Sequence, residues 1–424
     1  MNNIYEELRQ RGFLYQCTGE EALEKLLASQ QITFYIGFDP TADSLHVGSL
    51  IPIVAMMHLQ RAGHRPIAVT GGGTALVGDP SGKTEMRKLL TEEQIRQNAT
   101  HIADQLAHFL VLDGKKGLAV DNIDWLTDLR YIDFLRDIGR HFSVNKMLAT
   151  ESYKQRLETG LSFLEFNYML LQAYDFLVLY REYDTVLQMG GQDQWGNIVA
   201  GLDLIRRETS GQAYGLTFPL LTDASGQKLG KTVAGAVWLS PDKTSHFDFY
   251  QYWRNVDDAD VERFLKLFTF LPVEECQRLG ALQPPIINRA KEILAFELLS
   301  LVRSEDVARQ TYLAVVEQFG SADPDGKVAT TSAITTVKTA HVDATPTVEI
   351  AASVADHGVT IIDLLVRAGF AHSKGEARRL VRQGGARLDG HQITDETRLF
   401  TTAELALSPI LKAGKKRLAK VQIT

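Results

Sequence analysis

Two polar segments contain side chains suited to binding a nucleotide. Residues 39–49, Asp-Pro-Thr-Ala-Asp-Ser-Leu-His-Val-Gly-Ser, lie between a predicted strand and a predicted helix. A helix N-terminus there offers free amides to a phosphate, His46 could donate to a phosphate oxygen, and Gly48 would let a base or ribose approach the backbone. Residues 228–232, Lys-Leu-Gly-Lys-Thr, place two lysines in a polar loop that could hold a polyphosphate. Taken alone, the first segment could equally be a polar turn and the second a solvated loop.

A third set of polar residues lies on a predicted helix from Phe163 to Leu179. Tyr168 and Gln172 are four residues apart and Asp175 is three further on, so all three share one helix face. An ordinary core helix is the alternative, but a buried Tyr, Gln and Asp on one face need polar partners.

The segment 78–84, Gly-Asp-Pro-Ser-Gly-Lys-Thr, superficially resembles a phosphate-binding P-loop. A P-loop needs glycine where Val77 stands, and Asp79-Pro80 would place a carboxylate and an imino acid in a loop of amide donors. We therefore reject a P-loop.

The elements that must position these residues alternate between strand and helix. A capping box at 91–94 precedes an amphipathic helix whose apolar positions recur at helical spacing. The alternation predicts an α/β fold, a Rossmann-like parallel sheet with helices packed on it. We expect strands at 32–38, 66–70 and 185–189 and helices at 47–61, from 91, and at 194–207.

The amino-acid composition of the rest of the chain changes twice. Helix-forming residues dominate from about 246 to 320, and 321–350 is rich in Ser, Thr, Ala and Asp with weak periodicity. We therefore expect a catalytic domain over 1–232, a helical domain over 233–320, a linker over 321–355 and a small α+β domain over 356–424.

Composition is that of a globular chain, and charge is unevenly distributed along it. The 424 residues are 45% hydrophobic and 23% charged, with no apolar run of membrane-spanning length and no signal peptide. Two cysteines, Cys17 and Cys276, are too few for a disulfide framework or a thiolate metal site. We expect a soluble cytoplasmic protein with no protein-bound metal. Residues 356–424 hold 12 basic and 7 acidic residues in a chain of net charge −7. This basic tail indicates a polyanionic partner or a solvated basic end.

Together these motifs resemble bacterial tyrosyl-tRNA synthetases, within the class I aminoacyl-tRNA synthetases. The His-x-Gly turn and the Lys-x-x-Lys-Thr loop correspond to the two signature motifs of that class. Residues 35–41, 78–81 and 190–195 and the helix with Tyr168, Gln172 and Asp175 narrow the resemblance, which covers essentially the whole chain.

The resemblance implies an enzyme that activates L-tyrosine with ATP, releases pyrophosphate and transfers tyrosine to the 3′-terminal ribose of tRNA(Tyr). It implies that Tyr35 and Asp175 recognise the phenol group of the substrate by hydrogen bonds. It also implies that the tyrosine site is completed by Asp79, Tyr168, Gln172 and Gln194. A buried carboxylate satisfied by a phenol would be left unpaired by phenylalanine.

The resemblance also implies the ATP site, with magnesium arriving on ATP and no tightly bound cofactor. Nucleotide contacts are expected from Gly37, Asp39, Thr41, His46, Gly48, Gly191, Asp193 and Lys231. Catalytic charge and hydrogen bonds are expected from His46, Ser49, Lys83, Arg87, Lys228, Lys231 and Thr232. At Ser49 the sequence departs from the family, which usually has a second histidine there. A hydroxyl can donate a hydrogen bond but carries no charge. Ser49→His should therefore leave the rate of tyrosine activation unchanged or make it faster.

The tail resembles an RNA-binding module shared with a ribosomal small-subunit protein. The resemblance implies tRNA contacts at Lys374, Arg378 and Arg379, with Ser373 and residues 415–417 on the same RNA face, and at Arg206 and Arg207 for the acceptor end. It also implies a homodimer, with Phe163 at the contact.

Two other functions are alternatives to this one. A nucleotidyltransferase would not explain the pair expected to recognise the phenol. A non-catalytic RNA-binding paralogue should have lost Asp79, Asp175 or the lysine loop, and none of these is lost.

Overall fold

The computed structural model describes most of the chain, in two compact units. Described are residues 3–81, 90–224, 226, 228–232, 235–337, 347–355, 358–371, 373–389, 391–405, 409–414 and 417–423. The first unit comprises Met1–Leu313 with Asp325–Thr336, and the second comprises Ala314–Pro324 with Val337–Thr424. No helix among these described residues is both long and apolar enough to cross a membrane.

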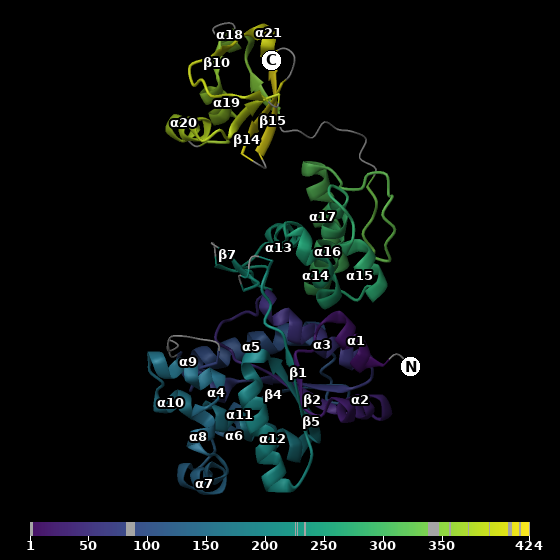
Figure 1. Cartoon of the computed structure of the whole chain (residues 1–424), viewed down its shortest axis with the longest axis vertical. Helices are drawn as coiled ribbons and strands as arrows, with labels where there is room; N and C mark the ends of the chain where they lie inside the picture. The colour runs from purple at the N-terminus through teal and green to yellow at the C-terminus, as the bar shows by residue number, and fades with distance from the viewer. Residues whose placement is uncertain are drawn as a thin grey trace. The chain divides into compact units, whose positions relative to one another are not determined.

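A six-stranded sheet in the order β1-β6-β5-β2-β3-β4 forms the centre of the first unit (Figure 1). Strands β2 to β6 run parallel and β1 pairs antiparallel with β6. The predicted parallel sheet is thus confirmed, with strands β1 (Gln16–Cys17), β2 (Thr33–Phe38), β3 (Arg65–Thr70), β4 (Leu118–Asp121), β5 (Thr185–Gly191) and β6 (Tyr214–Phe218).

Helices cover both faces of this sheet because the strand order reverses at β2. The connections β2→β3→β4 and β4→β5→β6 run in opposite directions, so right-handed crossovers put their helices on opposite faces. α3 packs on β3, whereas α11 and α12 pack together and against β5. The helices are α1 (Ile4–Arg11), α2 (Glu20–Ser29), α3 (Leu50–Arg61, after the 3₁₀ turn Val47–Ser49), α4 (Gly72–Ala75), α5 (Glu92–Phe109), α6 (Ile123–Leu126), α11 (Tyr168–Tyr183) and α12 (Trp195–Thr209).

The helix expected over 163–179 is two helices. A capping box between Ser162 and Glu165 starts the short helix α10 (Phe163–Phe166), and α11 begins at Tyr168. Between them the Asn167 side chain donates to the Phe163 carbonyl (2.7 Å), a local bond that competes with a continuous helix. Three further short helices precede α10: α7 (Tyr131–Asp137), α8 (Val144–Leu148) and α9 (Glu151–Thr159).

A short hairpin and a group of helices follow the sheet. Their packing centres on Trp253, which is 0% exposed and lies edge-on to Phe264 and Phe268. The elements are β7 (Lys231–Thr232), β8 (Gly235–Ala236), α13 (His246–Arg254), α14 (Val261–Phe268), α15 (Val273–Gly280), α16 (Ile287–Val302) and α17 (Glu305–Phe319).

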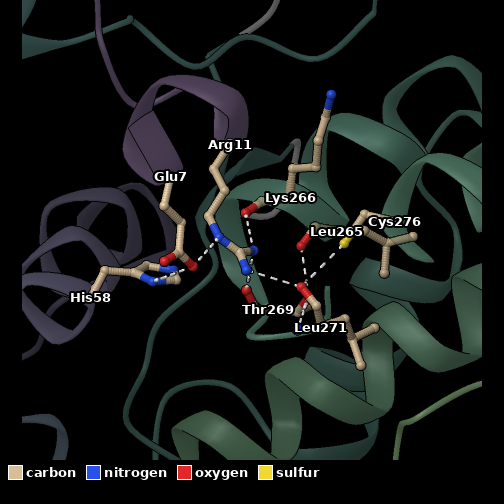
Figure 2. Close-up of polar contacts among 8 residues, drawn as sticks. All are labelled: Glu7, Arg11, His58, Leu265, Lys266, Thr269, Leu271 and Cys276. Carbon is tan, nitrogen blue, oxygen red and sulfur yellow. Dashed lines mark hydrogen bonds and ion pairs between the residues drawn. The ribbon is translucent and has the colours of Figure 1, made fainter. Parts of the chain in front are cut away.

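A buried arginine joins the N-terminal helix to the end of α14. The Arg11 guanidinium donates to the carbonyls of Lys266 (3.2 Å), Thr269 (3.0 Å) and Leu271 (3.0 Å), and Glu7 accepts from its Nε (Figure 2). The Glu7 carboxylate also lies 3.5 Å from His58 Nδ1. Burial, with the charges of Arg11 and Arg61 added, lowers the pKa of His58 to about 3, so this imidazole is neutral.

Replacing Arg11 with alanine is expected to lower the free energy of unfolding by about 3 kcal/mol, because three carbonyls, two of them in buried hydrogen bonds, lose their donor. Urea titration followed by tryptophan fluorescence measures this change. Arg9→Ala is the matched control: its side chain is 61% exposed and pairs with Glu6 on the helix surface, so a change below about 0.5 kcal/mol is expected. Equal losses in both variants would contradict the assignment.

The second unit contains a five-stranded sheet in the order β12-β11-β14-β15-β9 and a separate pair, β10 with β13. Its buried core includes Ile361, Leu364, Ala377 and Leu411. The elements are β9 (Thr347–Ile350), α18 (Ala352–Ala355), β10 (Val359–Thr360), α19 (Ile361–Arg367), α20 (Lys374–Arg382), β11 (Ala386–Leu388), β12 (His391–Gln392), β13 (Leu399–Phe400), α21 (Thr402–Leu405), β14 (Ile410–Ala413) and β15 (Arg417–Ile423).

Part of the segment expected as a linker, 321–355, forms structure in both units. Thr330 and Thr331 in the first unit donate to the buried carboxylate of Glu275. Strand β9 in the second unit pairs parallel with β15. The sequence does not reveal these partners because Glu275 and β15 both lie far away in the chain.

Candidate active site

The candidate site lies where the order of the parallel strands reverses, between β2 and β5. Asp39 follows the last residue of β2, and Gly191 ends β5. In an open parallel sheet the carboxyl ends of the strands at such a reversal leave a crevice for ligands. Asp39 and Gly191, both expected at ATP, are therefore brought to one edge of the sheet.

Two buried polar groups face the interior of this site. The Tyr35 side chain on β2 is 2% exposed, and its hydroxyl has no hydrogen-bond partner among the described residues. Asp175 on α11 is 4% exposed. Burial and the Asp175 charge raise the pKa of Tyr35 well above its ordinary value, so the hydroxyl keeps its proton as a donor.

Asp175 is held by two donors that sequence reasoning missed. Asn122 Nδ2 donates to its Oδ2 (2.9 Å) and Trp125 Nε1 donates to its Oδ1 (2.7 Å). Burial, opposed by these two bonds, raises the pKa of Asp175 to about 8. Asn122 directly follows β4, a strand we did not predict, so the strand-end position that identified Asp39 was not recognised there.

A chain of hydrogen bonds continues from Asn122 to the end of β2. Asn122 also donates to Thr74 Oγ1 (3.1 Å), and Thr74 donates to Asp39 Oδ1 (2.8 Å). Tyr168 donates to the other oxygen of Asp39 (3.0 Å). Asp175, Tyr168 and Asp39 are thus parts of one network, and Thr74 is a second member that the sequence did not indicate.

Three of the residues expected to complete the tyrosine site form a second network. Gln194 Nε2 donates to Asp79 Oδ2 (2.7 Å), and the Ser81 backbone amide donates to Asp79 Oδ1 (2.9 Å). Asn197 donates to both Gln172 (2.9 Å) and Gln194 (3.1 Å). The structure therefore brings Asp79, Gln172 and Gln194 together, with Asn197 as a link that the sequence did not suggest.

Asp79 gives the site a pH dependence that can be measured. Burial, together with the Asp39 charge, raises the pKa of Asp79 to about 6. Below that pH the carboxyl is protonated and cannot pair with an ammonium group. The KM for an amino-acid substrate is therefore expected to be about tenfold higher at pH 5 than at pH 7. Steady-state kinetics across this range test the effect, with Asp79→Asn as the variant whose KM should be high at both pH values. A flat wild-type profile would contradict the role.

The turn before α3 holds His46 in a capping position. His46 Nδ1 accepts from the Gly48 amide (2.9 Å), and the imidazole is exposed at the edge of the turn. A Cβ at Gly48 would lie 2.6 Å from His46 Cε1, so only glycine permits this approach. Ser49, half-buried at the start of α3, makes no capping bond with its side chain.

The lysine segment, residues 228–231, lies against this turn. The Val47 amide donates to the Val237 carbonyl (3.0 Å), and the Val237 amide donates to the Gly230 carbonyl (2.9 Å). Lys228 is exposed. Lys231 and Thr232 are described by their backbone in β7, and Lys83 and Arg87 lie outside the described residues. The two predicted phosphate-binding segments are therefore neighbours in space.

The remaining residues expected at ATP line the same edge of the sheet. Gly37 is exposed within β2, and a Cβ there would meet no atom within 4 Å. A Cβ at Gly191 would lie 2.5 Å from Asp193 Oδ1. Asp193 and Thr41 are exposed. These positions leave open backbone surface beside the His46 turn.

The arginines expected to bind tRNA are exposed. Arg206 and Arg207 lie in the last turn of α12, where Arg206 pairs with Asp203 (2.9 Å). In the second unit, α20 exposes Lys374, Arg378 and Arg379 beside one another. Lys374 pairs with Asp363 (2.9 Å) and Arg378 lies 3.8 Å from Glu396.

Comparison with known proteins agrees with this arrangement. The profile of the family described as tRNA synthetases class I (W and Y) matches residues 27–320, and that of the tyrosine–tRNA ligase SYY-like C-terminal domain matches residues 337–421. The fold and this match define a class I tRNA synthetase.

Comparison with individual proteins shows to which family within this class the chain belongs. A tyrosine–tRNA ligase of Clostridium botulinum (strain Alaska E43) is 52% identical over 100% of both chains, and one of Clostridium tetani is 50% identical over 100% of this chain and 99% of its own. A C-terminally truncated mitochondrial tyrosyl-tRNA synthetase of Aspergillus nidulans superposes with a TM-score of 0.67 at 28% identity, covering 75% of this chain and 95% of its own. The corresponding Coccidioides posadasii structure has a TM-score of 0.64 at 31% identity, covering 74% and 92%. The chain belongs to the tyrosine–tRNA ligase family.

Proposed function

We propose that this site joins L-tyrosine to the 3′-terminal ribose of tRNA(Tyr) in two steps. An oxygen of the tyrosine carboxylate attacks the α-phosphorus of ATP, and pyrophosphate leaves. The ribose hydroxyl of tRNA then attacks the carbonyl carbon of the adenylate, and AMP leaves. Neither step needs a nucleophile from the protein, so catalysis comes from positioning and from charge directed at the phosphates.

The observation that carries the choice of tyrosine is the buried pair Tyr35 and Asp175. A substrate phenol would donate to Asp175 and accept from Tyr35, whose hydroxyl is otherwise unpartnered among the described residues. Asn122 and Trp125 already fix the orientation of the carboxylate. Asp79, Tyr168, Gln172 and Gln194 lie at the same sheet edge and would hold the ammonium end.

The proposed ATP site is formed by the turn at 39–49 and the lysine segment. His46, Ser49 and the amides of the turn would donate to the phosphates, and Gly37, Gly48 and Gly191 leave room for the ribose and base. Lys228 and Lys231, with Lys83, Arg87 and Thr232, would balance the charge of the leaving pyrophosphate. Magnesium would enter with ATP as part of the substrate.

The tRNA partner is supported by the exposed arginines of α12 and the basic face of α20. Contacts from these side chains to phosphates would make tRNA binding fall steeply with salt. We place the reaction in the cytoplasm, where tRNA charging takes place.

The proposed homodimer is supported by apolar side chains exposed on helices α7 to α10. These four helices lie on one side of the first unit (Figure 1). Phe163 is 71% exposed, an unusual exposure for a large aromatic side chain. The others are Tyr131, Ile132, Leu135, Val144, Leu157 and Leu164.

Replacing Phe163 with aspartate is expected to shift the protein from dimer to monomer, because a charge would then be buried at the contact. Analytical ultracentrifugation measures the mass. Phe247→Asp, at an exposed phenylalanine of α13, is the control and should leave the mass unchanged. A dimeric Phe163→Asp variant would place the contact elsewhere.

The second candidate is a non-catalytic RNA-binding paralogue, which the exposed basic face of α20 alone would suit. Amino-acid-dependent ATP–pyrophosphate exchange separates the two. Exchange with tyrosine, and none with phenylalanine or tryptophan, is expected. Binding of tRNA without exchange for any of the three would overturn the catalytic function.

A further inference from the structure

Three side chains from the helical part of the first unit hold the lysine segment, residues 228–231, and the residues just before it. A backbone bridge pairs Thr222 with Lys228. Asp260 and Arg263 contact Ala224 and Thr222, and Tyr252 contacts Gly230. None of these three side chains belongs to the two phosphate-binding segments themselves.

Asp260 and Arg263 form hydrogen bonds, as a pair, with the backbone just before the lysine segment. Asp260 is 3% exposed; its Oδ2 accepts from the Ala224 amide (2.8 Å) and its Oδ1 accepts from Arg263 Nη2 (2.6 Å). Arg263 also donates to the Thr222 carbonyl. The pair thus satisfies one backbone donor and one backbone acceptor, which holds this stretch of backbone beside the start of α14.

Tyr252 acts on the other end. Its hydroxyl oxygen accepts from the Gly230 amide (2.9 Å). Gly230 has a φ of +80°, and a Cβ there would lie 2.3 Å from Val47 Cγ2. Gly230 is therefore confined between Tyr252 and the turn that carries His46, and no other residue fits this position.

A cavity lies beside these polar contacts. A cavity of about 890 Å³ is lined by Asp223, Leu229, Tyr252, Asp260 and Phe264, among others. Since close-packed side chains do not fill this space, a few hydrogen bonds set the distance between the segment and the helices.

The helix that carries Arg263 is also bonded at its other end. Arg11 donates to the carbonyls of Lys266 and Thr269 at the end of α14, and Glu7 connects Arg11 to His58 on α3 (Figure 2). Helix α3 starts immediately after the His46 turn. One eight-residue helix is thus connected to both phosphate-binding segments.

We infer that Tyr252, Asp260 and Arg263 are positioning residues for the lysine segment. They hold it against the His46 turn, so that the lysine charges lie where pyrophosphate leaves ATP. This inference rests on the proposed role of Lys228 and Lys231. Charge stabilises a transition state efficiently only when it is placed beforehand, so loosening the segment should slow activation without weakening tyrosine binding.

The test uses the full chain with Tyr252→Phe and Arg263→Ala, each assayed by the rate of tyrosyl-adenylate formation per titrated active site. Tyr252→Phe removes one acceptor and should slow formation about fivefold; Arg263→Ala should slow it about tenfold. Arg263→Lys should restore part of the rate, since an ammonium can still reach Asp260. The KM for tyrosine should stay constant in all three variants.

Two controls separate positioning from general destabilisation. Glu262→Gln removes a charge from the same helix at a side chain with the same 42% exposure as Arg263, and should leave the rate unchanged. The double variant Tyr252→Phe with Lys228→Ala should lose less than the product of the single losses, because Tyr252 acts through the segment.

The outcomes distinguish this inference from the proposed function. A Lys228→Ala variant with full activity would overturn the proposed role of the lysine. If Lys228→Ala is slow while Tyr252→Phe and Arg263→Ala form adenylate at the wild-type rate, only the positioning inference fails. Multiplicative losses in the double variant would also overturn it, since they would show that Tyr252 acts independently of the segment.

Discussion

Replacing Asp175 with asparagine is expected to lower kcat/KM for tyrosine about a hundredfold while leaving that for phenylalanine nearly unchanged. In the proposed site, at a pH above the Asp175 pKa of about 8, the substrate phenol would donate to a buried carboxylate that Asn122 and Trp125 hold in place. A hydrogen bond to a buried charged group contributes about 1.5–3 kcal/mol, and 1.4 kcal/mol corresponds to a factor of ten. Phenylalanine makes no such bond with either residue, so its small rate should persist and the preference for tyrosine should collapse.

Pyrophosphate exchange with each amino acid in turn measures this preference. Tyr35→Phe is the matched variant: it removes a neutral hydroxyl from the same pocket, so a smaller loss of about tenfold is expected. A preference for tyrosine that survives in Asp175→Asn would show that the phenol is read elsewhere.

The stability of Asp175→Asn separates lost recognition from lost folding. Burial raises the pKa of Asp175 to about 8, above its value in the unfolded chain. The folded protein therefore binds more protons than the unfolded one between about pH 4 and pH 8, and stability falls as pH rises through that range. Asparagine cannot ionise, so the variant should lose this slope. In the absence of tyrosine, urea unfolding at pH 9 should find it at least as stable as the wild type.

The sequence identified the sheet edge because its signals are local. The strand 32–38, the turn at 39–49 and the helix after it follow one another without interruption, and the structure contains β2, the His46 turn and α3 there. Likewise, the expected capping box at Thr91 and the buried face of α5 are both present. Periodicity and caps depend on neighbours in the chain, so sequence alone suffices for them.

The partners of Asp175 could not be found in that way. Strand β4 has four residues and a mixed burial pattern, so it gives no clear alternation, and Asn122 and Trp125 follow it. Their bonds to Asp175 cross about fifty residues of chain. Such contacts follow only from the strand order, which places β4 beyond β3 and brings its carboxyl end toward α11.

The proximity of the two phosphate-binding segments is likewise a property of the fold. They are about 180 residues apart in sequence, and backbone bonds between Val47, Val237 and Gly230 join them. The three anchors have no distinctive pattern: Tyr252 lies in α13, Asp260 in the 3₁₀ turn before α14 and Arg263 in α14. An Asp and an Arg three residues apart are ordinary around a helix start. Only their contacts with Thr222 and Ala224 show what they hold.

Replacing His46 with alanine is expected to slow tyrosyl-adenylate formation about a hundredfold at saturating substrates, without changing the affinity for tyrosine. The imidazole is exposed at a helix start, beside the lysine segment, where negative charge develops on the phosphates of ATP. Loss of one such donor typically slows a reaction by about this factor. Rapid-quench measurement of adenylate formation gives the rate, and equilibrium dialysis gives the affinity.

His46 also caps the turn, so its two roles must be separated. Its Nδ1 accepts from the Gly48 amide, and alanine would lose that bond as well. Asparagine can accept from Gly48 through its amide oxygen and still offer an N–H to a phosphate, so His46→Asn should recover about half of the lost activation free energy. His101→Ala, which removes an exposed imidazole from α5, should have no effect. If His46→Asn formed adenylate as slowly as His46→Ala, the full imidazole would be required. If both variants formed adenylate at the wild-type rate, the phosphates of ATP would be bound by the backbone amides and the lysine segment alone.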